Sequence, residues 1–431
     1  MIKKLSAYKL YLIFSAATAL FFSLASTVMI VYHIQGVHLN PLQLILVGTT
    51  LEAACFMFEI PTGIVADVYS RKLSIVIGAF LIGIGFTLEG SVPKFAAVLA
   101  SQIIWGLGAT FLSGSVEAWI AEENKDMNLD QVFMKGAQAG QIGAVVGIIL
   151  STMLANFSIR FPLIISGIMC MLFSVFLAFF MPENNFKSSA PEDLNTFGKM
   201  GHTFMTSIRF IRSKPIVMLL LSVTLFYGLS SEGYDRLSTA HFLNDTTLPR
   251  LGNLQPVTWF GIFGITGMIL SAVVMQLFIG KLEKNNKINS AVMLLTTNVF
   301  YILSMIVFAL TRNFSVMLTG YLLTNIFRII NEPIYNSWLN NHIDENARAT
   351  VLSTNGQLNA LGQIIGGPII GIIATRISIS IGIACTALLM TPVVLLYFIS
   401  IFKDRKGKNV CDVGDSYETI NIGESSDDVY N

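Results

Sequence analysis

The sequence predicts an all-α integral membrane protein whose twelve transmembrane helices form two six-helix bundles, and three observations support this fold class. Apolar residues make up 53% of the 431 positions and charged residues 12%, where a soluble protein carries about 25% charged residues. The mean hydropathy is +0.67. Apolar stretches of membrane-spanning length recur along the chain, and Lys and Arg concentrate in alternate connections between them.

Twelve apolar stretches are each long enough for a helix to cross about 30 Å of hydrocarbon. Helices are expected because an isolated strand cannot satisfy its backbone in lipid, and the alternating pattern of a membrane barrel is missing from the sequence. The first stretch continues past Val31 and is longer than the apolar part of a cleaved signal peptide, so we expect it to be a span. The expected spans are residues 8–33, 42–66, 73–91, 95–120, 132–156, 160–181, 215–240, 257–280, 290–311, 314–338, 350–375 and 378–402.

The distribution of basic residues predicts which way the chain crosses the membrane. Twenty Lys and Arg fall in segments on the side of the N-terminus, five fall on the opposite side, and two lie within spans. Cytoplasmic loops carry the excess of Lys and Arg in membrane proteins. We therefore expect a multi-pass protein of the cytoplasmic membrane with both termini in the cytoplasm.

The chain divides into two similar halves. The longest connection separates an expected N-terminal bundle, residues 1–181, from a C-terminal bundle, residues 215–402, and residues 182–214 form a cytoplasmic linker. Span five contains Gly140-Gln-Ile and span eleven contains Gly362-Gln-Ile, which suggests the duplicated unit of many secondary transporters. Residues 403–431 are acidic and are expected to be a disordered cytoplasmic tail.

Three glutamates in spans two and three are the strongest candidates for chemistry. Glu52 and Glu59 are seven residues apart on one helical face, and Glu89 lies near the end of span three. None has a base three or four residues away on its own helix, and a carboxylate removed from water takes up a proton more readily. They are candidates for proton coupling or substrate binding; the alternative is a structural hydrogen bond or an ion pair with another helix.

Two further charge clusters occur in spans seven and ten. Glu232 and Arg236 have the i,i+4 spacing of a helical ion pair, with Asp235 between them, and Arg328 and Glu332 have the same spacing. These five residues are possible cavity charges. The alternative is structural pairing, or a salt bridge that breaks and forms as the two halves move.

Several function classes are excluded or disfavoured by the sequence. It contains no G-x-x-x-x-G-K-[ST] phosphate loop, so ATP is not the expected energy source. The five His have no metal-ligand spacing, and the four Cys form no close cluster. A net charge of +1 suggests no nucleic-acid partner. We expect no enzyme activity, no bound cofactor and no metal site, and the oligomeric state is left open.

The turn between spans two and three carries the most specific motif. It reads Gly63-Ile-Val-Ala-Asp67-Val-Tyr-Ser-Arg71-Lys72. This resembles the signature loop of the major facilitator superfamily, G-x-x-x-D-(R/K)-x-G-(R/K)-(R/K), and the resemblance extends over spans one to twelve. It implies a conformational latch. Gly63 would permit tight helix contact, and Glu117 is expected to hold Arg71 from the other side.

Two positions depart from the signature: Val68 replaces the usual base and Ser70 the usual Gly, so the latch is expected to be weaker. Within the superfamily, Glu59-Ile-Pro-Thr-Gly63 together with Glu52 and Glu89 is similar to the clostridial P-class tetracycline efflux family. That similarity implies export of tetracycline, as a magnesium chelate, in exchange for protons. It also implies that the three glutamates serve transport.

The resemblance to drug:proton antiporters is incomplete. Span five lacks the Gly-Pro motif of that group, which occurs as Gly367-Pro368 in span eleven, and Gln102 stands where a span-four Arg is usual. A multidrug exporter, a carrier for a metabolite such as a sugar or peptide, and a membrane sensor or scaffold without turnover remain alternatives. The closer resemblance to the tetracycline efflux family implies proton-coupled efflux of tetracycline by alternating access.

Overall fold

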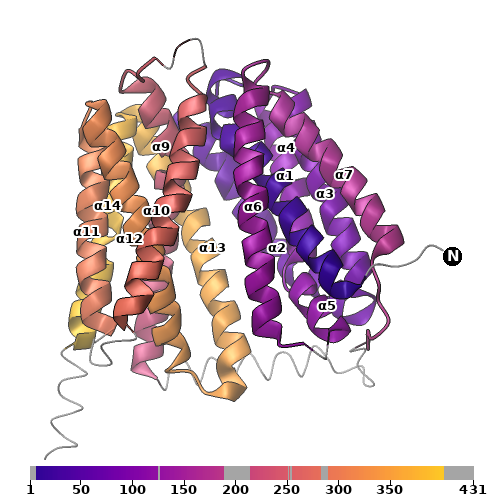
Figure 1. The fold of residues 1–431 in the computed structure, drawn as a ribbon. Coiled ribbons are helices and arrows are strands. Elements are labelled where there is room, and N and C mark those ends of the chain that lie inside the picture. Colours follow the sequence, from indigo (N-terminus) through magenta and orange to yellow (C-terminus); the bar gives the residue numbers. More distant parts are fainter. Residues whose placement is uncertain are drawn as a thin grey trace, which may run out of the picture.

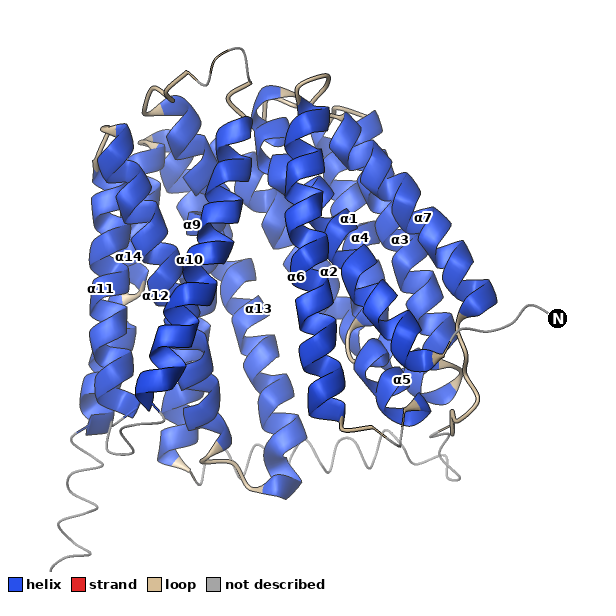
Figure 2. Cartoon of the chain, viewed as in Figure 1, coloured by secondary structure: helices blue, strands red, loops and turns tan. Residues whose placement is uncertain are grey.

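The computed structural model describes residues 6–124, 127–188, 214–250, 252, 255–282 and 290–401. Every regular element in these ranges is a helix, as Figure 2 shows. The expected linker therefore lies largely, and the expected acidic tail wholly, outside the described residues.

The first group of helices follows the expected spans one to six. It comprises α1 (Ala7–Gln35), α2 (Pro41–Val68), α3 (Arg71–Ser91), α4 (Phe95–Leu112), α5 (Ser115–Glu123), α6 (Leu129–Ala155) and α7 (Phe161–Phe180). The second group comprises α9 (Pro215–Asn244), α10 (Thr258–Leu282), α11 (Ser290–Leu310), α12 (Phe314–Asn340), α13 (Glu345–Arg376) and α14 (Ile379–Leu389). Helical residues continue after a turn at Met390 to Ile401. The two groups stand side by side in Figure 1.

Span four was expected as one helix and is instead broken in two. Gly114 adopts φ +69°, in the left-handed region that only glycine enters freely, and α5 begins at the next residue. This break changes the direction of the chain. The side chains of α5 therefore do not continue the faces of α4.

Local sequence explains where several helices begin. Asn40 caps α2 because its side chain accepts from the Gln43 backbone N–H, and the Gln43 side chain in turn accepts from the Asn40 backbone N–H. Ser70 caps α3 through the Leu73 N–H, and Asn313 caps α12. These caps satisfy amide groups that would otherwise be unpaired at the ends of the helices.

Large apolar side chains cover the outside of the bundle. Leu172, Phe179 and Leu395 are each about 60% exposed, with values of 62%, 58% and 62%. So many exposed large apolar side chains are uncommon on soluble monomers and suit a lipid surface. Eleven of the described helical stretches are long and apolar enough to cross a membrane; α12 is more polar and is not among them.

The two groups meet along one end of the bundle. We call the end with the start of α1 and the α2–α3 turn the inner end, because its basic residues predict a cytoplasmic position, and the opposite end the outer end. At the outer end Thr375 Oγ1 accepts from the Leu42 N–H at 2.9 Å, and Asn156 Oδ1 accepts from the Gln255 N–H at 3.0 Å. Contact between α2 and α13 continues inward as far as Glu59 and Gln357.

Toward the inner end the groups diverge. A Cβ added at Gly261 on α10 would collide with Thr152 on α6. At Gly63 on α2 and Gly356 on α13, which lie nearer the inner end, nothing lies within 4 Å of an added Cβ. Gly63 was expected to permit a tight helix contact, and in this conformation it makes none. The structure is therefore closed at the outer end and open at the inner end.

Candidate transport site

The signature turn forms an ion-pair network, but with a different acid from the one expected. Arg71 pairs with Asp67, one turn earlier, and its Nε lies 3.7 Å from Glu122 Oε1. Glu117 was expected to hold Arg71, and this is wrong in the structure: Glu117 is exposed, and the second acid is Glu122. Glu117 and Glu122 are five residues apart on α5 and so point in different directions, and it is the face of Glu122 that lies toward Arg71.

The Ser that replaces the usual Gly in the signature has a structural role. Ser70 Oγ donates to Glu183 Oε2 at 2.7 Å, and the Lys72 N–H donates to Glu183 Oε1 at 2.9 Å. A carboxylate at the start of α3 is stabilised by the helix dipole and by the unpaired amides there. Glu183, which the sequence analysis did not single out, thus ties the residues after α7 to the α2–α3 turn.

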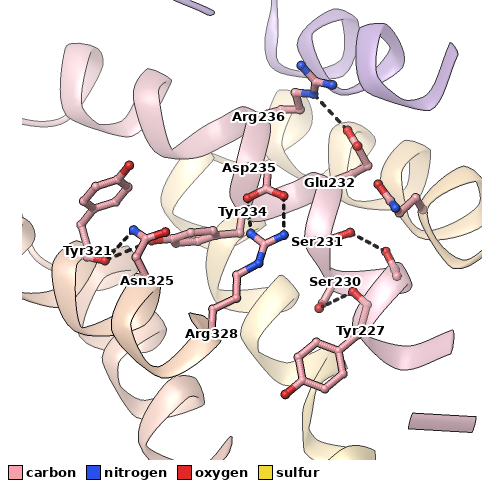
Figure 3. A network of polar contacts seen from close by, with 12 residues as sticks. Tyr227, Ser230, Ser231, Glu232, Tyr234, Asp235, Arg236, Tyr321, Asn325 and Arg328 are labelled. Atoms are coloured by element: carbon pink, nitrogen blue, oxygen red, sulfur yellow. Dashed lines mark hydrogen bonds and ion pairs between the residues drawn. The ribbon is translucent and has the colours of Figure 1, made fainter. Parts of the chain in front are cut away.

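Glu232 and Arg236 on α9 form the ion pair that their spacing predicted, with Arg236 Nε 3.2 Å from Glu232 Oε2. Gly48 on α2 makes room for this pair, since a Cβ there would collide with the Glu232 carboxylate. In Figure 3 Arg236 extends toward the helices of the first group. The pair therefore sits where the two halves touch, and Gly48 was not recognised from the sequence.

Arg328 on α12 does not form the expected pair with Glu332. It binds Asp235 on α9 through two bonds, Nη1–Oδ1 at 2.5 Å and Nη2–Oδ2 at 3.0 Å (Figure 3). Such a two-pronged pair is the strongest arrangement of these groups. Glu332 is exposed and makes no hydrogen bond or ion pair with the described residues.

A polar cavity of about 300 Å³ lies between the helices of the second group. Its walls carry amides, phenols and the charges of α12. They comprise Thr224, Tyr227, Ser231, Tyr301, Arg328, Asn331, Glu332, Tyr335, Asn336, Asn355, Asn359 and Gln363. Many of these groups already bond one another: Tyr227 donates to Asn298, Asn331 donates to Tyr227, and Tyr335 donates to Asn355. The cavity is therefore lined with positioned donors and acceptors.

Glu52 and Glu59 on α2 approach polar residues of the second group, and we call these two glutamates together with Glu232, Asp235, Arg236, Arg328 and Glu332 the inter-half site. Glu52 is half-buried, one turn from Gly48, and within electrostatic range of Glu232, Asp235 and Arg236. It makes no hydrogen bond or ion pair with any residue in the described ranges. Glu59 is exposed and accepts a bond from Gln357 Nε2 on α13 at 3.1 Å. The site thus carries more acids than bases. Both arginines are already paired, so Glu52, Glu59 and Glu332 have no base.

Glu89 lies apart from these residues, inside the first group. It is fully buried, and its Oε1 lies 2.6 Å from His33 Nε2 on α1. Ser101 and Gln102 on α4 both lie 2.8 Å from its Oε2. His33 was not singled out, although a lone His in an apolar span was a visible signal.

No group of three or more His, Cys, Asp or Glu side chains in the described ranges has the geometry of a metal site. Three clusters of described charged residues are the α2–α3 turn, the inter-half site and the Glu89 site; separate pairs such as His241–Asp245 and Lys214–Asp344 lie elsewhere.

Comparison with known proteins decides the family. The sequence model of the Major Facilitator Superfamily matches residues 11–367. This chain belongs to the major facilitator superfamily. It is 26% identical over 408 residues to the uncharacterized MFS-type transporter YxaM of Bacillus subtilis (strain 168), covering 92% of this chain and 96% of YxaM.

Solved major facilitator structures show the same fold. The nucleoside transporter NupG superposes with a TM-score of 0.72 at 16% identity, covering 93% of this chain and 100% of NupG. A mutant of the peptide transporter POT in complex with sulfate superposes with a TM-score of 0.73 at 15% identity, covering 91% and 94%. The chain is thus a multi-pass membrane transporter of small molecules and not an enzyme.

Proposed function

We propose that this major facilitator protein exports a small drug in exchange for protons by alternating access. The first cargo to test is tetracycline carried as its magnesium chelate, which would give antibiotic resistance. The inner opening would admit the drug from the cytoplasm or the inner leaflet. Protonation of carboxylates would then accompany release on the outer side.

The observation that carries the proposal is the surplus of acids in the inter-half site. Five carboxylates face this region, Glu52, Glu59, Glu232, Asp235 and Glu332, and Arg236 and Arg328 already pair with Glu232 and Asp235. Among the carboxylates without a base, Glu52 is half-buried, and a carboxylate partly removed from water attracts a proton or a cation. Competition between these two is the requirement for proton-coupled export of a cationic or metal-bound cargo.

The same geometry favours a conformational role for the signature turn. Asp67, Arg71 and Lys72, together with Gly63, lie at the inner end, where the halves are apart in this conformation. We infer that this turn meets the second group when the inner end closes. The predicted orientation, with cytoplasmic termini, places the turn and the drug entrance on the cytoplasmic side.

Drug-driven proton movement in inverted vesicles tests the proposal. Vesicles with a pH-sensitive dye in the lumen are energised, and tetracycline with Mg²⁺ is added. Export into the lumen should release protons outward, and Glu52→Gln should reduce this response about tenfold or more, as expected for losing an interaction of about 1.4 kcal/mol. Glu117→Gln, at an exposed carboxylate away from the site, is the matched control. A normal response from a well-expressed Glu52→Gln/Glu59→Gln variant would contradict the coupling role.

A second candidate is a carrier for a polar metabolite, and the amide-lined cavity favours it. Asn331, Asn355 and Gln363 offer donors and acceptors suited to a peptide or a nucleoside more than to an apolar drug. Proteins of similar fold are named nucleoside and peptide transporters. Uptake of labelled dipeptides and nucleosides, with no response to tetracycline, would favour this candidate.

A further inference from the structure

Glu89 and its partners form a buried cluster at the outer end of the first group. Glu89 lies two residues before the end of α3, and His33 lies two residues before the end of α1. Their side chains are each 1% exposed. A buried charge is expensive unless its lone pairs are satisfied, and here three polar side chains converge on one carboxyl group.

The hydrogen bonds around Glu89 can be completed with or without an added proton. Ser101 Oγ lies 2.8 Å from Glu89 Oε2 and 2.7 Å from the Val98 carbonyl oxygen, yet a hydroxyl has a single proton to donate. If Glu89 is ionised, Ser101 donates to the carboxylate. If Oε2 carries a proton, that proton is donated to Ser101 Oγ, and Ser101 donates to Val98. Neither state leaves the Ser101 hydroxyl unpaired.

Gln102 provides the same choice from the other side of Oε2. Its Nε2 donates to Glu89, while its Oε1 is buried and has no hydrogen-bond partner in the described ranges. Rotation of this amide by half a turn would present Oε1 instead, so that a protonated Glu89 could donate to Gln102 in place of Ser101. The amide can therefore bond Glu89 in either protonation state.

His33 is the third partner, and its ring can donate or accept. At 2.6 Å from Glu89 Oε1, Nε2 donates to a carboxylate or accepts from a carboxylic acid, depending on tautomer and charge. We propose that Glu89, His33, Ser101 and Gln102 form a proton-binding site at the outer end of the N-terminal group, loaded from the outer aqueous phase. One proton from water adds to the Glu89–His33 pair, raising its charge by one, and leaves by the reverse step.

The charges facing this site from neighbouring elements are few. Tyr32 on α1 donates to the Glu89 backbone carbonyl, and Arg160, before α7, acts electrostatically on Tyr32. From α9 of the other half, Arg236 is within electrostatic range of Glu89. The proton therefore changes the field at Arg236, which also binds Glu232 where the halves meet. In its role as a driver of transport, the site rests on the proton coupling proposed above.

Infrared difference spectroscopy of the full-length protein in right-side-out vesicles tests the site directly. Lowering only the external pH should produce the carbonyl band of a protonated carboxylic acid, and this band should shift in D₂O. Glu89→Gln should remove the band, whereas Glu117→Gln should leave it unchanged. Ser101→Ala and His33→Asn keep the carboxyl group and should shift the frequency of the band, because each removes a hydrogen-bond partner.

The possible results separate the Glu89 proton site from the proposed coupling to drug transport. A band that persists in Glu89→Gln belongs to another carboxylate and overturns the site. If Glu89→Gln does not fold, an unshifted band in both Ser101→Ala and His33→Asn overturns it equally. A Glu89 band without drug-driven proton movement in the wild type would leave the site standing and remove the proposed coupling. Proton movement without a Glu89 band would retain the coupling and remove this site.

Discussion

At the residue scale, the pairing of Arg328 with Asp235 predicts that the stability losses of substitutions at these two residues do not add. Arg328→Gln leaves a carboxylate without its partner between α9 and α12. It should lower stability by about 1–3 kcal/mol, an amount moderated because both side chains are about 40% exposed. Adding Asp235→Asn removes the unpaired charge and should recover part of that loss. Thermal unfolding in detergent measures the stability loss of the two single variants and of the double variant.

The control is Arg250→Gln, at an exposed Arg after α9 for which the structure shows no ion pair among the described residues. Its midpoint should match the wild type. If the double variant and Arg328→Gln lose equal stability, the loss in Arg328→Gln does not come from leaving the Asp235 carboxylate unpaired.

This pair also shows what residue-level reasoning can reach. The Glu232–Arg236 pair follows from helical spacing, because one turn brings such side chains together wherever the helix lies. Asp235 and Arg328 are 93 residues apart, and Glu89 and His33 are 56 apart. Such partners depend on which helices pack together. The prediction that Arg328 pairs with Glu332 was wrong because it rested on helical spacing alone, whereas the actual partner, Asp235, lies on another helix.

At the element scale, Glu183 is expected to hold the start of α3. Glu183→Ala removes both bonds to Ser70 and Lys72, so the first turn of α3 should open more often. Hydrogen exchange of residues 69–74 should speed up several-fold, while the remainder of α3 keeps its protection. Glu117→Ala, on the same end of the bundle, should leave exchange unchanged; protection lost equally in both variants would count against the role of Glu183.

Elements were predictable to different degrees. Long apolar stretches predicted the helices well, because length and hydropathy suffice in a bilayer. The break between α4 and α5 was missed, since Gly114 interrupts an otherwise continuous apolar and small-residue run. The partner of Arg71 was also missed, because which face of α5 lies toward α3 depends on packing that the sequence does not reveal.

At the scale of the whole molecule, the closed outer end and open inner end predict opposite behaviour of two matched cysteine pairs. With the native cysteines replaced by Ser, Thr152→Cys/Gly261→Cys joins α6 and α10 where they touch. Val145→Cys/Met268→Cys lies seven residues nearer the inner end on the same faces of the two helices, where the groups are apart. A disulfide forms only when the Cα atoms approach to about 7 Å or less.

The outer pair should therefore cross-link rapidly in the resting protein and the inner pair slowly. Because alternating access requires the outer contact to open, the outer disulfide should abolish transport, and a reductant should restore it. Gel mobility after mild oxidation and a transport assay before and after reduction measure both effects. Full transport with the outer pair cross-linked would mean that the halves do not separate there, and the cargo would need another route.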